Sequence, residues 1–189
     1  SGKSTLANEL APLINAEILS TDKIREELYK DETIQGNWNE IESLLHERLK
    51  KYIRQNKPVI LDATFAMRPW RLTITQNLLF DKEIEWIGWW FKTPLEICLE
   101  WNQLRERKVD DPVIKRFAAA LSNKIFSPDL SEGFATLVNI DPSSTEDITK
   151  EIKSRLSNLD RNITQRKNKD SIKELHGYSK LLDFERLLY

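Results

Sequence analysis

The chain has 189 residues, of which 29 are Lys or Arg and 30 are Asp or Glu, so its formal net charge is −1. This balance excludes a protein that coats nucleic acid through bulk positive charge, and any anion must be recognised locally. One cysteine, Cys98, and two histidines are too few for an internal disulfide or a structural zinc site, which favours a reducing cytoplasm and oxygen ligands for any metal. No apolar run approaches the roughly 18 residues of a membrane span, so no membrane partner is predicted.

Helix and strand patterns alternate along the chain. Apolar periodicity and breaker residues predict, in order, a helix over Thr5–Leu10 that Pro12 ends, a strand over Ala16–Leu19, helices over Asp22–Lys30 and Asn37–Gln55, a strand within Pro58–Thr64 that ends at Asp62, a helix from Arg68, a strand over Glu83–Phe91, helices over Thr93–Arg107 and Val113–Asn123, a strand over Ala135–Ile140 and a helix from about Thr145. This alternation predicts an α/β fold with a parallel sheet flanked by helices.

The opening residues Ser1-Gly2-Lys3-Ser4-Thr5 match the second half of a Walker A phosphate-binding loop, G-x-x-x-x-G-K-[ST]. In such a loop, backbone N–H groups and a helix N-terminus surround a phosphate, the lysine neutralises β/γ oxygens and the hydroxyl ligates Mg²⁺. Gly-Lys-Ser/Thr arises by chance in about one chain in ten of ordinary composition, so the rest of the chain must support it. The first half of the motif and the strand before it are absent, which predicts a fragment that lacks its first strand.

Acidic residues follow two of the predicted strands. Asp22 opens a helix, and Arg25, three residues on, shares its helix face. Asp22 could accept the proton of an attacking hydroxyl while Arg25 holds an anionic part of the acceptor; the alternative is an acid at the helix dipole beside a solvated arginine. Asp62, at the end of the next strand, could hold Mg²⁺ or orient the acceptor hydroxyl. The alternative is an aspartate that forms a turn. Ala63 stands where many ATPases that activate water have a glutamate.

Two later segments carry basic residues. The helices predicted over Thr93–Arg107 and Val113–Asn123 meet at a basic corner, which suits a lid over a triphosphate or, alternatively, a solvated charged hairpin. From Lys150 to Glu174 there are eight Lys or Arg and four Asp or Glu. This excess suits an arm that follows the phosphates of a nucleic acid or, alternatively, a solvated helix face.

The order of these motifs resembles the polynucleotide-kinase-like branch of P-loop kinases, which includes polynucleotide kinases, kinases acting on aminoacyl-tRNA and zeta-toxin-like enzymes. The motifs that carry the resemblance are Gly2-Lys3-Ser4-Thr5, Ser20-Thr21-Asp22-Lys23-Ile24-Arg25, Asp62-Ala63-Thr64, the Arg105–Arg116 hairpin and Glu132-Gly133-Phe134. It implies an AAA-type P-loop nucleoside-triphosphate hydrolase fold over residues 1–145, followed by a helical, partly basic extension over residues 146–189.

The resemblance also implies a role for each motif. The residues that would bind ATP are Ser1, Gly2, Lys3, Ser4, Thr5, Arg105 and Arg107. The Mg²⁺ ligands would be Ser4 and Asp62. Asp22 would be the general base, and the groups acting with it in catalysis would be Arg25, Lys3 and Arg107. The acceptor would be bound by Arg25, Asp62, Thr64 and Arg71.

The implied reaction is direct transfer of the ATP γ-phosphoryl group to a hydroxyl of a nucleic acid or a small molecule. Two other classes of function stay open: an ATP-dependent switch or ATPase that moves a partner domain, and a nucleic-acid-binding module that uses tryptophans and the basic tail. Trp101 stands where relatives often have arginine, so the lid arginine that reaches the phosphate is undecided. Phe65 stands where they often have asparagine, which bears on how the acceptor is recognised. The sequence identifies neither the acceptor nor the oligomeric state.

Overall fold

The computed structural model describes residues 2–77 and 84–159. Within the chain, two compact units are distinguished, Ser1–Ile152 and Lys153–Tyr189. In the second unit, residues 153–159 are helical. The beginning of the strand predicted from Glu83 and the basic tail beyond residue 159 lie outside the described residues.

The first unit alternates helices and strands, as predicted for an α/β fold. The elements are α1 (Lys3–Ile14), β1 (Glu17–Ser20), α2 (Thr21–Tyr29), α3 (Trp38–Arg54), β2 (Val59–Asp62), α4 (Arg68–Leu72), the π-helical turn η1 (Thr73–Asn77), β3 (Trp86–Phe91), α5 (Leu95–Gln103), α6 (Asp111–Ser122), the 3₁₀ turn η2 (Leu130–Glu132) and β4 (Phe134–Ile140). A further helix begins at residue 148.

Several helix boundaries differ from the sequence prediction by a few residues, and two of the differences involve proline. Pro12 does not end α1, which continues until Asn15 caps it in the left-handed conformation with its N–H bonded to the carbonyl of Ala11. Proline lacks the N–H for one helical hydrogen bond and its ring crowds the carbonyl four residues earlier. Helix α1 accordingly continues for less than one turn beyond Pro12. Pro112 lies inside the first turn of α6, where proline is favoured. Helix α5 ends early, at Gln103, so the predicted lid arginines lie in the connection to α6.

The described strands form two separate parallel pairs, β1–β2 and β3–β4, where the sequence predicted one parallel sheet that lacks its first strand. In the first pair the register runs from Glu17 opposite Val59 to Ser20 opposite Asp62. In the second pair β3 runs beside β4 with one irregularity near its start. Parallel neighbours need long crossover connections, and helices provide these here.

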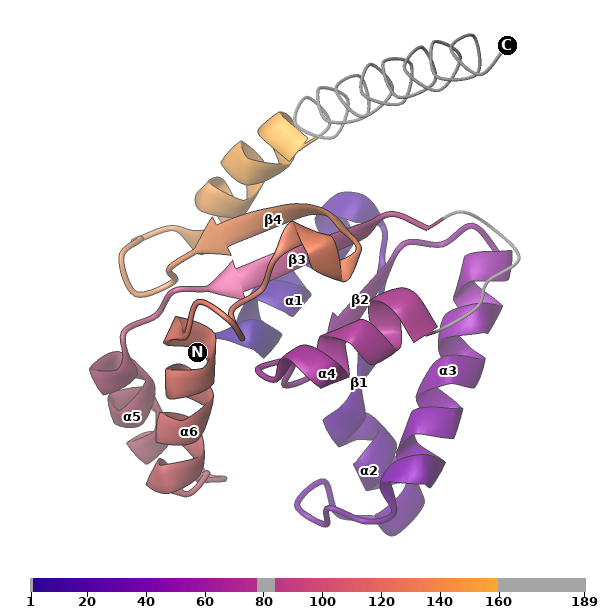
Figure 1. Ribbon diagram of the computed structural model, residues 1–189, viewed down its shortest axis with the longest axis horizontal. Helices are drawn as coiled ribbons and strands as arrows, with labels where there is room; N and C mark the ends of the chain where they lie inside the picture. The colour runs from indigo at the N-terminus through magenta and orange to yellow at the C-terminus, as the bar shows by residue number, and fades with distance from the viewer. Residues whose placement is uncertain (1, 78–83, 160–189) are drawn as a thin grey trace, which may run out of the picture. The chain divides into compact units, whose positions relative to one another are not determined.

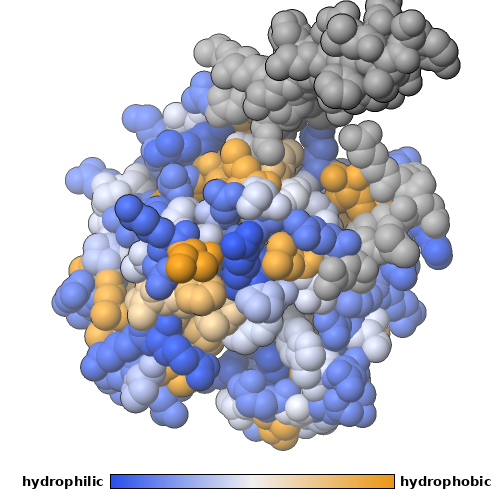
Figure 2. Space-filling model, in the orientation of Figure 1, coloured by the Kyte–Doolittle hydropathy of each residue, from blue (hydrophilic) through white to orange (hydrophobic). Residues whose placement is uncertain are grey.

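The main hydrophobic core lies between the β1–β2 pair and the helices α2 and α3 (Figure 1). Ile41, Leu45 and Leu49 are spaced four residues apart on α3, so they share one helix face, and all three are buried. They pack with Leu19 of β1 and Ile24 of α2. On the face shown in Figure 2, hydrophilic residues prevail and apolar residues form separate patches. The core therefore fixes α2 against β1 and positions the residues that follow β1.

Candidate functional site

The predicted phosphate-binding turn lies at the start of α1. Gly2 precedes the helix with φ of +75°, a left-handed conformation that glycine adopts at little steric cost. A Cβ atom on Gly2 would lie 3.4 Å from Pro142 and 3.7 Å from Trp101, so the turn is closely packed from behind. Ser4 and Thr5 are exposed, and Ser1 lies outside the described residues. The first N–H groups of a helix have no partner within it, which makes this turn suited to an anion.

Lys3 lies in a cluster of charges. Burial lowers the pKa of Lys3, and the nearby Arg105 lowers it further, whereas the carboxylates of Asp62 and Asp22 raise it. All three residues are therefore close enough to Lys3 to affect its charge. Because burial makes the ammonium ion costly, a bound polyphosphate would be favoured as its counter-charge.

Asp22 is paired with two arginines from different parts of the chain. Arg25 Nη1 donates to Asp22 Oδ1 at 2.7 Å, and Arg107 Nη1 lies 3.6 Å from Asp22 Oδ2. Arg107 also pairs with Glu32 at 3.3 Å, a contact that was not predicted from the sequence. The Asp22 side chain stays 50% exposed, so a ligand can reach its carboxylate. In the part of the chain that the structure describes, the buried Nε of Arg25 has no hydrogen-bond partner.

The parallel pairing of β1 and β2 explains why two acids share one edge. Ser20 lies opposite Asp62 in the register, and Asp22 follows Ser20 by two residues at the start of α2. Ligands of open parallel sheets bind at this carboxyl edge. Asp62 is partly buried and Thr64 is exposed.

The chemistry of this edge fits Mg²⁺. Among the described residues, no three or more His, Cys, Asp or Glu side chains gather in a way that could hold a metal ion. Ser4 and Asp62 nevertheless offer a hydroxyl and a carboxylate oxygen. Mg²⁺ is usually held by one or two protein oxygens, with water and substrate phosphates completing its shell. By chemical type, these two residues could supply protein ligands to a magnesium–nucleotide site.

Asn102 shapes the connection that carries the lid arginines. Its Nδ2 donates to the carbonyl of Val109 at 2.7 Å, and the Val109 N–H donates back to Asn102 Oδ1 at 2.9 Å. This pair of hydrogen bonds closes a loop from which Arg107 reaches Asp22, while Arg105 stays exposed near Lys3. The sequence analysis missed Asn102, because a lone asparagine near the end of a helix belongs to no motif.

A cavity of about 390 Å³ opens beside the Gly2 turn. Its lining combines an aromatic face with charged and polar groups, from Gly2, Thr5, Trp101, Arg105, Pro142, Thr145, Glu146 and Ile148. The volume lies within the range of small-ligand pockets, and an indole face suits a flat ring. The sequence analysis picked out the first part of this lining but missed the loop after β4, which has no motif of its own.

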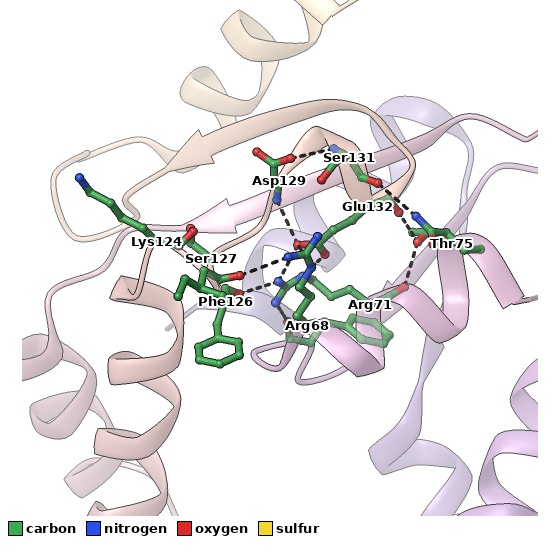
Figure 3. Close-up of polar contacts among 12 residues, drawn as sticks. Arg68, Arg71, Thr75, Lys124, Phe126, Ser127, Asp129, Ser131 and Glu132 are labelled. Atoms are coloured by element: carbon green, nitrogen blue, oxygen red, sulfur yellow. Dashed lines mark hydrogen bonds and ion pairs between the residues drawn. The ribbon is translucent and has the colours of Figure 1, made fainter.

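Arg71, predicted to bind the acceptor, lies elsewhere in the molecule's interior. It is 4% exposed, and its guanidinium group binds both carboxylate oxygens of Glu132 and three backbone carbonyls (Figure 3). Those bonds use all five N–H donors of an arginine. Arg71 therefore has no donor left for an acceptor molecule.

An α/β chain that begins its first helix at a Gly-Lys-Ser-Thr turn, with acids at the end of adjacent parallel strands, is a P-loop nucleotide-binding protein. Residues 1–123 match the AAA domain family AAA_33, and the chain belongs to that family. The match extends from α1 to the end of α6, so it includes the Gly2 turn, Asp22, Asp62 and the lid hairpin. Comparison with curated proteins gave no match. No helix in the described part of the chain is long and apolar enough to span a membrane.

Proposed function

We propose that this protein is a kinase of the polynucleotide-kinase-like branch, which transfers the γ-phosphoryl group of ATP to a hydroxyl of a nucleic acid or a small molecule. The observation that carries the proposal is the half-exposed carboxylate of Asp22, which faces two arginines and lies close to Lys3. A base for an acceptor hydroxyl must be reachable and near the phosphate. The exposure of Asp22 and its closeness to Lys3, the proposed phosphate ligand, support this role. Ala63, directly after Asp62, offers no carboxylate to activate water, which favours transfer over hydrolysis.

The transfer uses groups that are already close together. Asp22 takes the proton of the acceptor hydroxyl, whose oxygen forms a bond to the γ-phosphorus while the bond from that phosphorus to the bridging oxygen of ADP breaks. Lys3 and Arg107 offset the negative charge of the transferring group. Arg25, which donates to Asp22, holds an anionic part of the acceptor beside its hydroxyl.

Ser4 and Asp62 are the proposed ligands of Mg²⁺, which would neutralise β- and γ-phosphate charge when bound. The exposed Thr64, two residues beyond Asp62, is left to contact the acceptor. In the absence of a metal, these residues carry no positive charge to hold a triphosphate. ATP binding should therefore weaken on removal of Mg²⁺ even with Lys3 intact.

The cavity beside Gly2 is the proposed site of the nucleotide base. Trp101 supplies a stacking face, and Arg105 reaches the same cavity from the lid. Because stacking of a base on an aromatic side chain contributes about 1–3 kcal/mol, Trp101→Leu should weaken ATP binding by about 5-fold to 150-fold. Trp70→Leu, at a tryptophan outside this lining, is the matched control and should leave ATP affinity unchanged.

The decisive assay follows labelled γ-phosphate from ATP into 5′-hydroxyl oligonucleotides, tRNA and metabolite pools. Asp22→Asn should abolish most transfer and keep ATP binding nearly intact, whereas Glu26→Gln, at an exposed acid of the same helix, should change neither. Lys3→Ala should weaken ATP binding itself, with Lys23→Ala as its control. Unchanged transfer by Asp22→Asn would reject Asp22 as the base. ATP turnover without any phosphorylated acceptor would favour the alternative function, an ATP-dependent switch.

A further inference from the structure

The ion pair between Arg71 and Glu132 is the most deeply buried charged contact in the described part of the chain. Arg71 is 4% exposed and Glu132 is fully buried. Arg71 Nε donates to Glu132 Oε2 at 2.6 Å and Arg71 Nη2 donates to Glu132 Oε1 at 2.8 Å, in a bidentate arrangement. The two residues are 61 positions apart, so the pair joins distant segments of the chain.

The remaining donors of Arg71 bind two different loops (Figure 3). Its Nη1 donates to the carbonyls of Phe65 at 3.0 Å and Ala66 at 3.1 Å, in the loop that follows Asp62. Its Nη2 donates to the carbonyl of Phe126 at 2.6 Å, in the segment that leaves α6. Neighbouring Arg68 contacts the same segment through the carbonyl of Ile125 at 3.4 Å. One guanidinium group thus holds the loop after β2 and the C-terminal end of the lid hairpin together.

Glu132 is itself held from the opposite side. Its Oε1 accepts the backbone N–H of Asp129 at 3.2 Å, while the Asp129 carboxylate accepts the N–H of Ser131 at 2.8 Å, which together form a capping box around η2. The Thr75 hydroxyl, from η1, donates to the backbone carbonyl of Glu132. The carboxylate is therefore a fixed anchor, and the position of Arg71 follows from it.

We propose that Arg71 and Glu132 are a positioning pair that sets the place of the Asp62-Ala63-Thr64 loop relative to the α5–α6 hairpin. The proposal rests on the proposed function, in which that loop contacts Mg²⁺ and the acceptor while the hairpin supplies Arg107. A buried ion pair is seldom needed for stability, because apolar residues of similar size often serve as well. Apolar residues cannot, however, bind three carbonyls from two loops, and a planar guanidinium with five donors can.

The kinetic test replaces the pair by apolar residues, in the double variant Arg71→Met/Glu132→Leu of the full chain. A displacement of about 1 Å can reduce a reaction about 100-fold, so acceptor phosphorylation should fall about 10-fold to 100-fold. The loss should appear in kcat or in the KM for the acceptor, and ATP affinity should stay within about 2-fold. Arg71→Lys, which keeps the charge but loses the planar fork, should not restore transfer.

Two control variants separate positioning from loss of stability. Leu49→Val, in the α3 core, lowers stability without touching either loop. Arg48→Met removes an exposed pair with Glu27 between α2 and α3. Wild-type transfer by the double variant would overturn the proposal, as would an equal loss of transfer in a core variant with the same melting temperature.

A second measurement does not depend on catalysis. Amide hydrogen exchange, without nucleotide or acceptor, should be faster in the double variant for residues 63–67 and 124–127 together, and unchanged in α3. Unchanged exchange in either loop would overturn the positioning role even in an active enzyme. If the wild-type protein transferred no phosphate, the proposed function would fail, while faster exchange in both loops would still support the link between them.

Discussion

Two arginine–carboxylate pairs in this molecule have nearly the same shortest distance and opposite surroundings. Arg71 Nε and Glu132 Oε2 lie 2.6 Å apart, and Arg25 Nη1 and Asp22 Oδ1 lie 2.7 Å apart. Glu132 is fully buried, whereas the Asp22 side chain is 50% exposed. Every donor of Arg71 is bound by the protein, but the buried Nε of Arg25 has no partner in the described residues. Distance alone therefore does not tell a structural pair from a functional one.

The two groups differ in exposure to solvent and in whether the protein itself satisfies all their hydrogen bonds. The Arg71–Glu132 group satisfies its own hydrogen bonds and has no access to solvent, so it can act only through what it holds in place. The Asp22 carboxylate is half exposed, so it can bind a further molecule. Because ion pairs of exposed groups contribute only about 0–1 kcal/mol to stability, we expect the half-exposed Asp22 carboxylate to contribute little to folding.

The largest expected effect is a difference in the free energy of unfolding between variants of the two groups. Glu132→Ala leaves Arg71 buried without its counter-charge, which should lower the free energy of unfolding by about 3–5 kcal/mol. Asp22→Ala removes a half-exposed group and should change that free energy by less than about 1 kcal/mol. Urea denaturation of the two variants beside the wild type measures both values. Equal losses would mean that the two groups do not differ in role.

The next effect is on catalysis and concerns the second arginine at Asp22. Arg107→Met removes a half-exposed cation that pairs with Asp22 and Glu32. The free energy of unfolding of this variant should stay within about 1 kcal/mol of the wild-type value. Phosphate transfer should fall at least about 10-fold, since arginines that contact a transferring phosphoryl group contribute about 1,000-fold or more. Lys108→Met, at the adjacent exposed lysine, is the control, and steady-state rates that match between the two variants would remove Arg107 from the site.

Sequence patterns are enough to place the candidate site at this edge of the β1–β2 pair, because the features concerned are local. The Gly-Lys-Ser-Thr turn, Asp22 after one strand and Asp62 at the end of another can each be recognised from a few neighbouring residues. The family match supports the P-loop part of that interpretation. The order of helices and strands was predicted for the same reason, since periodicity is a local property.

The role of Arg71 could not be predicted in the same way. Arg25 and Arg71 both lie on helices that follow a strand, and nothing near either residue tells them apart. What separates them is Glu132, which meets Arg71 from 61 positions away. The division of the strands into two pairs and the contribution of the loop after β4 to the cavity also depend on contacts between distant segments.

A smaller effect tests the charge of Lys3. Burial is the largest cause that lowers the pKa of this lysine from its ordinary 10.5. Lys3 should therefore lose its proton, and the protein its affinity for ATP, as the pH rises through a value below 10.5. Lys3→Arg should keep its affinity to higher pH, because a guanidinium group stays protonated. Calorimetric titration with a non-hydrolysable ATP analogue between neutral and alkaline pH measures this, and identical profiles would contradict it.

The smallest effect concerns His46, whose exposure lies between those of the two arginine groups. Burial lowers the pKa of His46, and its Nε2 lies 4.0 Å from Glu42, too far for a good hydrogen bond. Because the folded pKa lies below the unfolded one, stability should be complete above about pH 6.5 and fall as the pH drops through the folded value. His46→Gln should reduce the fall in melting temperature between neutral and mildly acidic pH. If the melting temperature of the variant changed with pH as much as that of the wild type, partial burial would not control the pKa of His46. That result would also weaken the conclusion that exposure distinguishes the roles of the charged groups compared above.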